Sequence, residues 1–138
     1  MIYPDRTVRL LYVEDDPEAA RLFARRLGWF RAVRFEVEQA SDLQTALACL
    51  ANEAYDAVLL DLSLPDGEAM STLAAAGALA RRVPIIVLTG NDDADTALLA
   101  ARLGVQDYLC KNDQDGLSVG HAVLEAIERH RWVRGATA

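Results

Sequence analysis

One stretch of the sequence constrains the fold more than any other: an apolar run that leads directly into an acid and then into a turn. The run covers residues 57–60, the acid is Asp61, and a Pro-Asp-Gly turn occupies residues 65–67. An unbroken apolar run bounded by turn residues is typical of a strand buried on both faces. Asp61 is therefore expected at the carboxyl end of a central strand, where open α/β sheets bind ligands. This stretch alone explains Asp61 equally well as a structural acid or as a reactive one.

Four further segments have the composition of strands. Three are mostly apolar, and the one at residues 33–37 alternates apolar with charged residues, which is typical of an edge strand. The expected strands cover residues 8–13, 33–37, 84–88 and 107–110, in addition to 57–61. Helical patterns separate these strands, so the sequence predicts right-handed βαβ units and a parallel sheet with helices on both faces.

The expected helices have recognisable starts and ends. Asp16 and Pro17 fit the N-cap and first turn of the first helix, and Gly28 fits its end. A Ser-x-x-Gln capping box beginning at Ser41 predicts the start of the second helix. Three more helices are expected from apolar spacing: one over residues 70–82, one that Gly104 closes, and a last one with Val119, Val123 and Ile127 on its buried face.

Size and charge limit the possible classes of protein. The 138 residues suit one domain, which we place at 7–132 with a tail at 133–138. No apolar run approaches the ~20 residues that span a bilayer, and no signal peptide pattern is present, so we expect a cytoplasmic protein without membrane contact. The net charge of −7 argues against direct binding of nucleic acid. We expect Cys49 and Cys110 to be reduced core residues, and His121 and His130 to lie on the surface of the last helix.

Polar residues follow four of the five expected strands. Glu14 and Asp15 end the first, Asp61 the third, Thr89 the fourth and Lys111, the single lysine of the chain, the fifth. These ends share one edge in a parallel sheet, so the side chains should converge. Glu14 and Asp15 are either solvated loop acids or ligands of a shared cation.

Three carboxylates and an incoming phosphate favour Mg²⁺, a hard cation with oxygen ligands. With that ion bound, the Asp61 carboxylate could attack an activated phosphoryl group and form an aspartyl phosphate. The Thr89 hydroxyl and the Lys111 amine could each contact one phosphoryl oxygen.

Four sequence motifs in register then resemble one known family. They are Leu-Leu-Tyr-Val-Glu-Asp-Asp-Pro, Leu-Leu-Asp-Leu-Ser-Leu-Pro-Asp-Gly, Ile-Val-Leu-Thr-Gly and Asp-Tyr-Leu-Cys-Lys, starting at residues 10, 59, 86 and 107. Together they resemble the response-regulator receiver domain of two-component signalling. The resemblance covers almost the whole chain and implies a flavodoxin-like α/β fold: a five-stranded parallel sheet of order 2-1-3-4-5 with five helices in three layers.

The resemblance also implies a role for each site residue. Asp61 would be the phosphoacceptor, Glu14 and Asp15 the acidic metal pair, and the Ser63 main-chain carbonyl a further ligand of Mg²⁺. Thr89 and Lys111 would be the switch hydroxyl and amine that contact the phosphoryl group, and Tyr108 would be the switch aromatic. Ser63 and Asn91 flank the site and are expected to tune hydrolysis of the acyl phosphate. Asn112 departs from the family, which usually has proline after the lysine.

The implied partners are those of a phosphorelay. A histidine kinase or a histidine phosphotransfer protein would donate the phosphoryl group, and an effector domain or protein would read the result. The switch face would comprise the fourth helix, the strand 107–110 and the last helix, and could also support a homodimer. The only chemistry expected is self-phosphorylation and self-dephosphorylation, so the chain is not expected to be an enzyme.

Two alternatives remain at this stage. A phosphohydrolase of the haloacid dehalogenase type also uses a strand-end Asp nucleophile with Mg²⁺, but it needs an acid two residues later. That position holds Ser63, which cannot act as a general acid at neutral pH. The other alternative is a receiver-shaped docking module that never accepts phosphate, and labelling with a phosphodonor would distinguish it.

Overall fold

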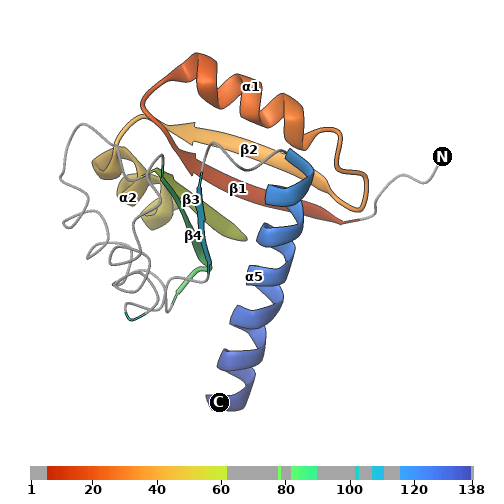
Figure 1. Ribbon diagram of the computed structural model, residues 1–138. Coiled ribbons are helices and arrows are strands. Elements are labelled where there is room, and N and C mark those ends of the chain that lie inside the picture. Colours follow the sequence, from red (N-terminus) through yellow and green to blue (C-terminus); the bar gives the residue numbers. More distant parts are fainter. Residues whose placement is uncertain are drawn as a thin grey trace.

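The strands of the chain form a single parallel sheet that helices cover on both sides (Figure 1). The computed structural model describes residues 6–61, 78, 82–89, 102, 107–110 and 116–137, with only the backbone described at 89, 107–110, 116–117 and 132–137. The elements with bounds in the described residues are β1 (Thr7–Val13), α1 (Pro17–Leu27), β2 (Arg34–Ala40), α2 (Leu43–Asn52), β3 (Ala57–Asp61), β4 (Ile85–Thr89), β5 (Asp107–Cys110) and α5 (Gly116–Thr137).

The sheet has the order β2-β1-β3-β4-β5, and every pairing in it is parallel. The change of direction at β1 and β3 is that of a flavodoxin-like sheet, so the flavodoxin-like α/β fold is confirmed. The expected helices over residues 70–82 and before Gly104 fall on residues that lie almost wholly outside the described set. Among the described helices, none is long and apolar enough to span a bilayer.

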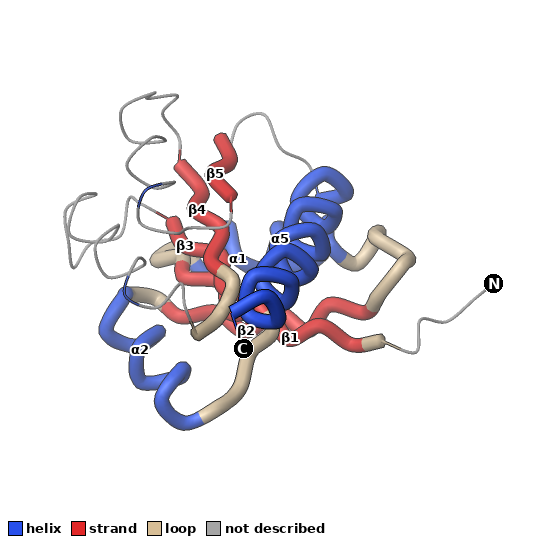
Figure 2. The backbone as a smooth tube through the Cα atoms, turned by 90° about the horizontal axis from the view of Figure 1, so that it is seen from below, coloured by secondary structure: helices blue, strands red, loops and turns tan. Residues whose placement is uncertain are grey.

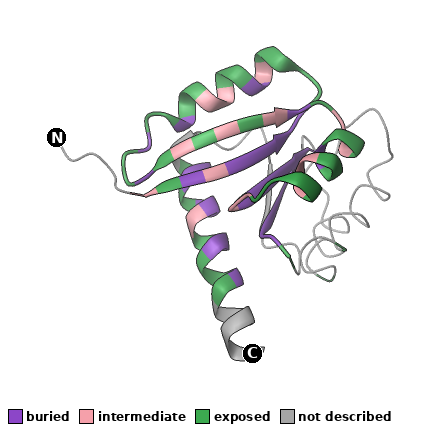
Figure 3. Ribbon diagram, turned by 180° about the vertical axis from the view of Figure 1, so that it is seen from behind, coloured by how far each residue is buried: buried purple, intermediate pink, exposed green. Residues whose placement is uncertain are grey.

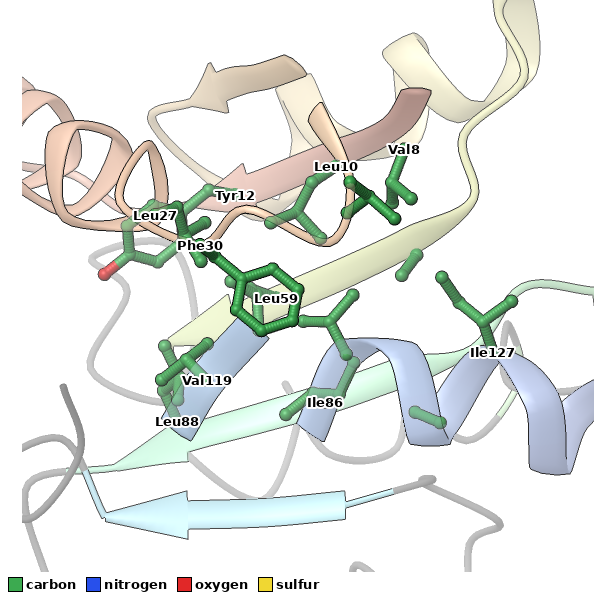
Figure 4. Close-up of a cluster of buried hydrophobic side chains, with 14 of the residues drawn as sticks. Val8, Leu10, Tyr12, Leu27, Phe30, Leu59, Ile86, Leu88, Val119 and Ile127 are labelled. Atoms are coloured by element: carbon green, nitrogen blue, oxygen red, sulfur yellow. The ribbon is translucent and has the colours of Figure 1, made fainter. Parts of the chain in front are cut away.

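Each face of the sheet packs against its own helices, and alternate residues of a strand therefore belong to different cores. One core lies under α2 and includes Leu11, Val58 and Val87. The other lies under α1 and α5, which are neighbours on the opposite face (Figure 2). Its side chains from β1, β3, β4, α1 and α5 interlock in Figure 4, where Tyr12 and Leu88 mark the end nearest the carboxyl edge of the sheet.

The starts of α1 and α2 are each fixed by an aspartate. Asp16 caps α1 by accepting a hydrogen bond from the Glu18 N–H at 3.0 Å, with Pro17 in the first turn, as predicted. The predicted capping box at Ser41 is wrong by one residue. Asp42 is the N-cap of α2, because its extended backbone directs the carboxylate to the Thr45 N–H at 2.7 Å.

The edge strand β2 is longer than its sequence pattern predicted. Alternating exposure along it, visible in Figure 3, matches a strand with one solvated face. The apolar alternation that defined the strand ends at Val37, but pairing with β1 continues to Ala40, which is opposite Val13. Because Glu38 and Gln39 are both polar, the apolar alternation did not predict the last three residues of β2, which reach the carboxyl edge of the sheet.

Helix α5 packs closely on the segment that follows α1. A Cβ atom at Gly120 would lie 2.9 Å from Cγ of Phe30, so this contact requires glycine. His121 is exposed, as expected, but the prediction of a surface His130 is wrong: it is buried because it continues the face of Val123 and Ile127. Helix α5 runs to Thr137, past residue 132, the predicted end of the domain. The domain boundary at residue 132 stays a prediction.

Candidate functional site

Two buried carboxylates lie at the carboxyl edge of the sheet, on neighbouring strands. Asp61 is the last residue of β3 and Glu14 directly follows β1; the two residues are 1% and 3% exposed, respectively. The preceding residues, Val13 and Leu60, are paired across the two strands. The sequence thus places both acids one step beyond the same pair, on strands ~4.8 Å apart.

Both acids also belong to the face of the sheet that α1 and α5 cover. Alternation along β3 puts Asp61 on the side of Leu59, which belongs to that core. Glu14 lines a pocket of about 150 Å³ together with residues of α1, β4 and α5. The other lining residues are Tyr12, Ala19, Leu22, Phe23, Arg26, Leu88 and Val119.

The main chain of Glu14 is held on both sides by the end of β2. Its N–H donates to the Ala40 carbonyl at 2.9 Å, and its carbonyl accepts a hydrogen bond from Nε2 of Gln39 at 2.7 Å. The N–H of the same peptide, that of Asp15, is also held, because it donates to the Glu14 carboxylate at 3.1 Å. The loop that carries the two acids is therefore defined by hydrogen bonds at three successive backbone groups.

Asp15 differs from its neighbour because its side chain is exposed. Among the described side chains, no group of three or more histidines, cysteines, aspartates or glutamates is arranged to hold a metal ion. Glu14, Asp15 and Asp61 therefore do not form a gathered set of three ligands in this structure, although two of them are neighbours in the sheet.

The donors present fit a hard divalent cation. Buried carboxylates are stable only with cationic or hydrogen-bonding partners, and both Glu14 and Asp61 do have further interactions in the structure. Mg²⁺ is commonly held by one or two carboxylates, with water and substrate oxygens filling the remaining positions. Two buried carboxylates with an exposed third beside them satisfy that requirement.

The remaining predicted site residues are described only by backbone or lie outside the described part of the chain. Thr89 is the last residue of β4, one step past Leu88, which pairs with Asp61. Tyr108 lies in β5 opposite Val87. The predictions made for Ser63, Asn91, Lys111 and Asn112 concern residues outside the described set.

Sequence reasoning missed Gln39 as part of this site. The available signal was its position: it continues the inward series of Phe35 and Val37, where an amide replaces an apolar residue. An amide on that face, two strand positions beyond Val37, indicates a polar partner at the sheet edge. Cys49 is a free thiol, as predicted, but it is half-buried and packs against the core under α2 instead of lying within it.

Comparisons with known proteins agree with this fold. The family model of the response regulator receiver domain matches residues 10–119. The transcriptional regulatory protein QseB of Haemophilus influenzae is 32% identical over 128 residues, which are 91% of this chain and 54% of that protein. The swarming motility regulation protein RssB of Serratia marcescens is 31% identical over 104 residues, 75% of this chain and 46% of that protein. The chain thus spans about half the length of these relatives.

Solved structures show the same fold. A CheY-like response regulator receiver domain from Methanospirillum hungatei superposes with a TM-score of 0.72 at 23% identity, covering 91% of this chain and 97% of that one. A response regulator from Burkholderia pseudomallei, with a phosphorylated aspartic acid, calcium ion and citrate, has a TM-score of 0.68 at 26% identity, covering 95% and 73%. The chain belongs to the response regulator receiver domain family, and so to the signalling domains of two-component systems.

Proposed function

We propose that the chain is a phosphoacceptor whose Asp61 receives a phosphoryl group with Mg²⁺ bound beside it. The observation that carries the proposal is the pair of buried carboxylates, Glu14 and Asp61, at adjacent strand ends. The Burkholderia response regulator, which contains a phosphorylated aspartic acid and a calcium ion, supports an aspartate acceptor in a domain that also binds a divalent cation.

The chemistry is a displacement at phosphorus. An oxygen of the Asp61 carboxylate forms a bond to phosphorus as the bond from phosphorus to the donor breaks, and the donor leaves as free imidazole from phosphohistidine or as acetate from acetyl phosphate. Glu14, Asp15 and the Ser63 carbonyl would hold Mg²⁺, which supplies neutralisation of charge on the phosphoryl oxygens. The Thr89 hydroxyl and the Lys111 amine would contact the other oxygens.

The signal would leave the site through a change in packing. The Thr89 hydroxyl moves toward the new phosphate and Tyr108 turns inward, which shifts the fourth helix, β5 and α5 between two arrangements. That face would then bind an effector domain or protein, or a second copy of the chain. Ser63 and Asn91 would set the lifetime of the acyl phosphate. In this proposal two helices between β3 and β5 complete a three-layer fold with five helices.

The donor would be a histidine kinase or a histidine phosphotransfer protein, which are the phosphohistidine sources of two-component signalling. No reaction besides self-phosphorylation and self-dephosphorylation is part of the proposal. A docking module without phosphorylation remains the second candidate, because Asp15 is exposed and no three-ligand group is gathered among the described side chains.

The test is intact-mass measurement after incubation with acetyl phosphate and Mg²⁺. The wild-type chain should gain the mass of one phosphoryl group, and the gain should disappear with a chelator. The variant Asp61→Asn keeps the shape of the side chain but cannot attack phosphorus, so it should show no gain. An equal gain in that variant would exclude Asp61 as the acceptor, and no gain in the wild-type chain would favour the docking module.

A further inference from the structure

We infer that Gln39, at the end of the edge strand β2, is a positioning residue for the metal-binding acids. The inference rests on the proposed function and deepens it. Its starting observation is the 2.7 Å hydrogen bond from Nε2 of Gln39 to the main-chain carbonyl of Glu14, which joins residues 25 positions apart in the chain.

The bond acts at the peptide that links the two acids. The Glu14 carbonyl belongs to the Glu14–Asp15 peptide, whose N–H already donates to the Glu14 carboxylate at 3.1 Å. Rotation of this peptide would break that hydrogen bond and release the Glu14 carboxylate from the Asp15 N–H. The donor at the carbonyl, Gln39 Nε2, and the acceptor at the N–H, the Glu14 carboxylate, together fix the peptide plane between the two acids and keep the Glu14 carboxylate in place.

The Gln39 side chain holds the Glu14 carbonyl, while the backbone of β2 holds the Glu14 N–H. The backbone of β2 already anchors Glu14, because the Ala40 carbonyl accepts the Glu14 N–H at 2.9 Å. The Gln39 side chain extends the ladder by one bond past the last strand pair, Val13 with Ala40. An apolar side chain at position 39 would keep the strand and lose only the bond to the carbonyl.

Position 39 does not need an amide for packing. The residues before it on the same face, Phe35 and Val37, are apolar and pack against the core under α1 and α5. Gln39 itself is half-buried, so a methionine of similar length fits the same environment. The hydrogen bond to the Glu14 carbonyl therefore explains the amide at position 39. Loss of a group that hydrogen-bonds to a metal-binding residue commonly weakens metal affinity by about 10- to 100-fold.

The test compares Gln39→Met with Gln44→Met, a matched exchange on the exposed side of α2. Mg²⁺ affinity is measured by calorimetry on the full chain, and stability without metal by urea unfolding. We expect Gln39→Met to bind Mg²⁺ about tenfold more weakly than wild type, while Gln44→Met binds as wild type does. An unchanged Mg²⁺ affinity in folded Gln39→Met would overturn the inference, even if its stability falls, because loss of stability alone indicates a structural residue.

A second measurement does not depend on a variant that folds. In the wild-type chain, NMR should show the side-chain amide resonances of Gln39 shifting during a Mg²⁺ titration, while those of Gln44 stay in place. Unmoved Gln39 resonances during saturable Mg²⁺ binding would contradict the inference. If the wild-type chain binds no Mg²⁺ at all, the proposed function fails first, so the two failures are distinguishable.

Discussion

The two ends of strands β1 and β3 carry polar clusters of opposite character. At the carboxyl ends lie Glu14 and Asp61, which we call the acidic edge; both are nearly fully buried. Toward the amino ends lies a cluster around Arg9, which we call the arginine cluster. Its guanidinium donates to Glu53 at 3.0 Å and to Glu38 at 3.4 Å, and these three side chains are 37% to 46% exposed.

The polar groups of the arginine cluster pair with one another. Arg9 also donates to the Ala54 carbonyl and lies 4.8 Å from the centre of the Tyr55 ring, and the Tyr55 hydroxyl donates to Glu38 at 2.7 Å. The hydrogen bond to Glu53 raises the pKa of Arg9 above its ordinary value. Charges of both signs in solvent need no ligand, and exposed ion pairs of this kind contribute little to stability.

The acidic edge brings two carboxylates together in a buried place. Burial penalises carboxylates unless a cation or hydrogen-bond donors compensate it, so this arrangement is typical of functional sites. The difference shows that the number of polar residues does not identify a site. Burial of charged groups does, and the two clusters can be compared directly by substitution.

The largest contrast is expected for Mg²⁺ binding. Glu14→Gln removes a charged oxygen ligand and should weaken Mg²⁺ binding about 100-fold in calorimetry. Arg9→Met removes the centre of the arginine cluster and should leave Mg²⁺ affinity unchanged while lowering the Tm. Equal losses of affinity in the two variants would show that the effect is one of general stability.

A smaller contrast is expected between two kinds of acid at the carboxyl edge, the helix cap Asp42 and the buried pair Glu14 and Asp61. Asp42 also follows a strand end, but it caps α2 through its bond to the Thr45 N–H. Asp42→Ala should lower the Tm by a few degrees without affecting Mg²⁺ binding, whereas Ser41→Ala should have no measurable effect. A larger loss in the Ser41 variant would restore the capping box that the sequence predicted.

The pH dependence of the cap follows from the pKa of Asp42. The hydrogen bonds from Thr45 lower that pKa below 3.8. A depressed folded-state pKa contributes stability above the unfolded value, and the contribution is lost as the pH falls through the folded value. The Tm difference between wild type and Asp42→Ala should therefore disappear in acid below pH 3.8, and a constant difference would contradict this cause.

The smallest effect is expected in the arginine cluster. Burial, followed by the hydrogen bond to Glu38, raises the pKa of Tyr55 well above 10.0. A raised folded-state pKa contributes stability below the unfolded value and loses it as the pH rises. Tyr55→Phe keeps the ring under Arg9 and should lower the Tm slightly at pH 7. The difference should shrink in strong alkali, as thermal unfolding at increasing pH would show.

The sequence by itself determined the elements whose signals are local. Apolar runs predicted the strands at residues 57–61 and 84–88, and Asp16 with Pro17 predicted the start of α1, because strand burial and helix capping depend on neighbouring residues. Order along the chain also placed Glu14 and Asp61 at one edge, since parallel strands end on the same side.

Only the tertiary structure decided the features that depend on distant partners. The end of β2 at Ala40 is set by pairing with β1, the burial of His130 by the length over which α5 packs, and the contact of Gln39 with Glu14 by the meeting of two strand ends. The same structure left Asp15 exposed beside the buried Glu14, a difference that two adjacent acids do not show in sequence. All four features have the same physical cause. Each depends on which residues far apart in the chain come together, and local propensity carries no information about that.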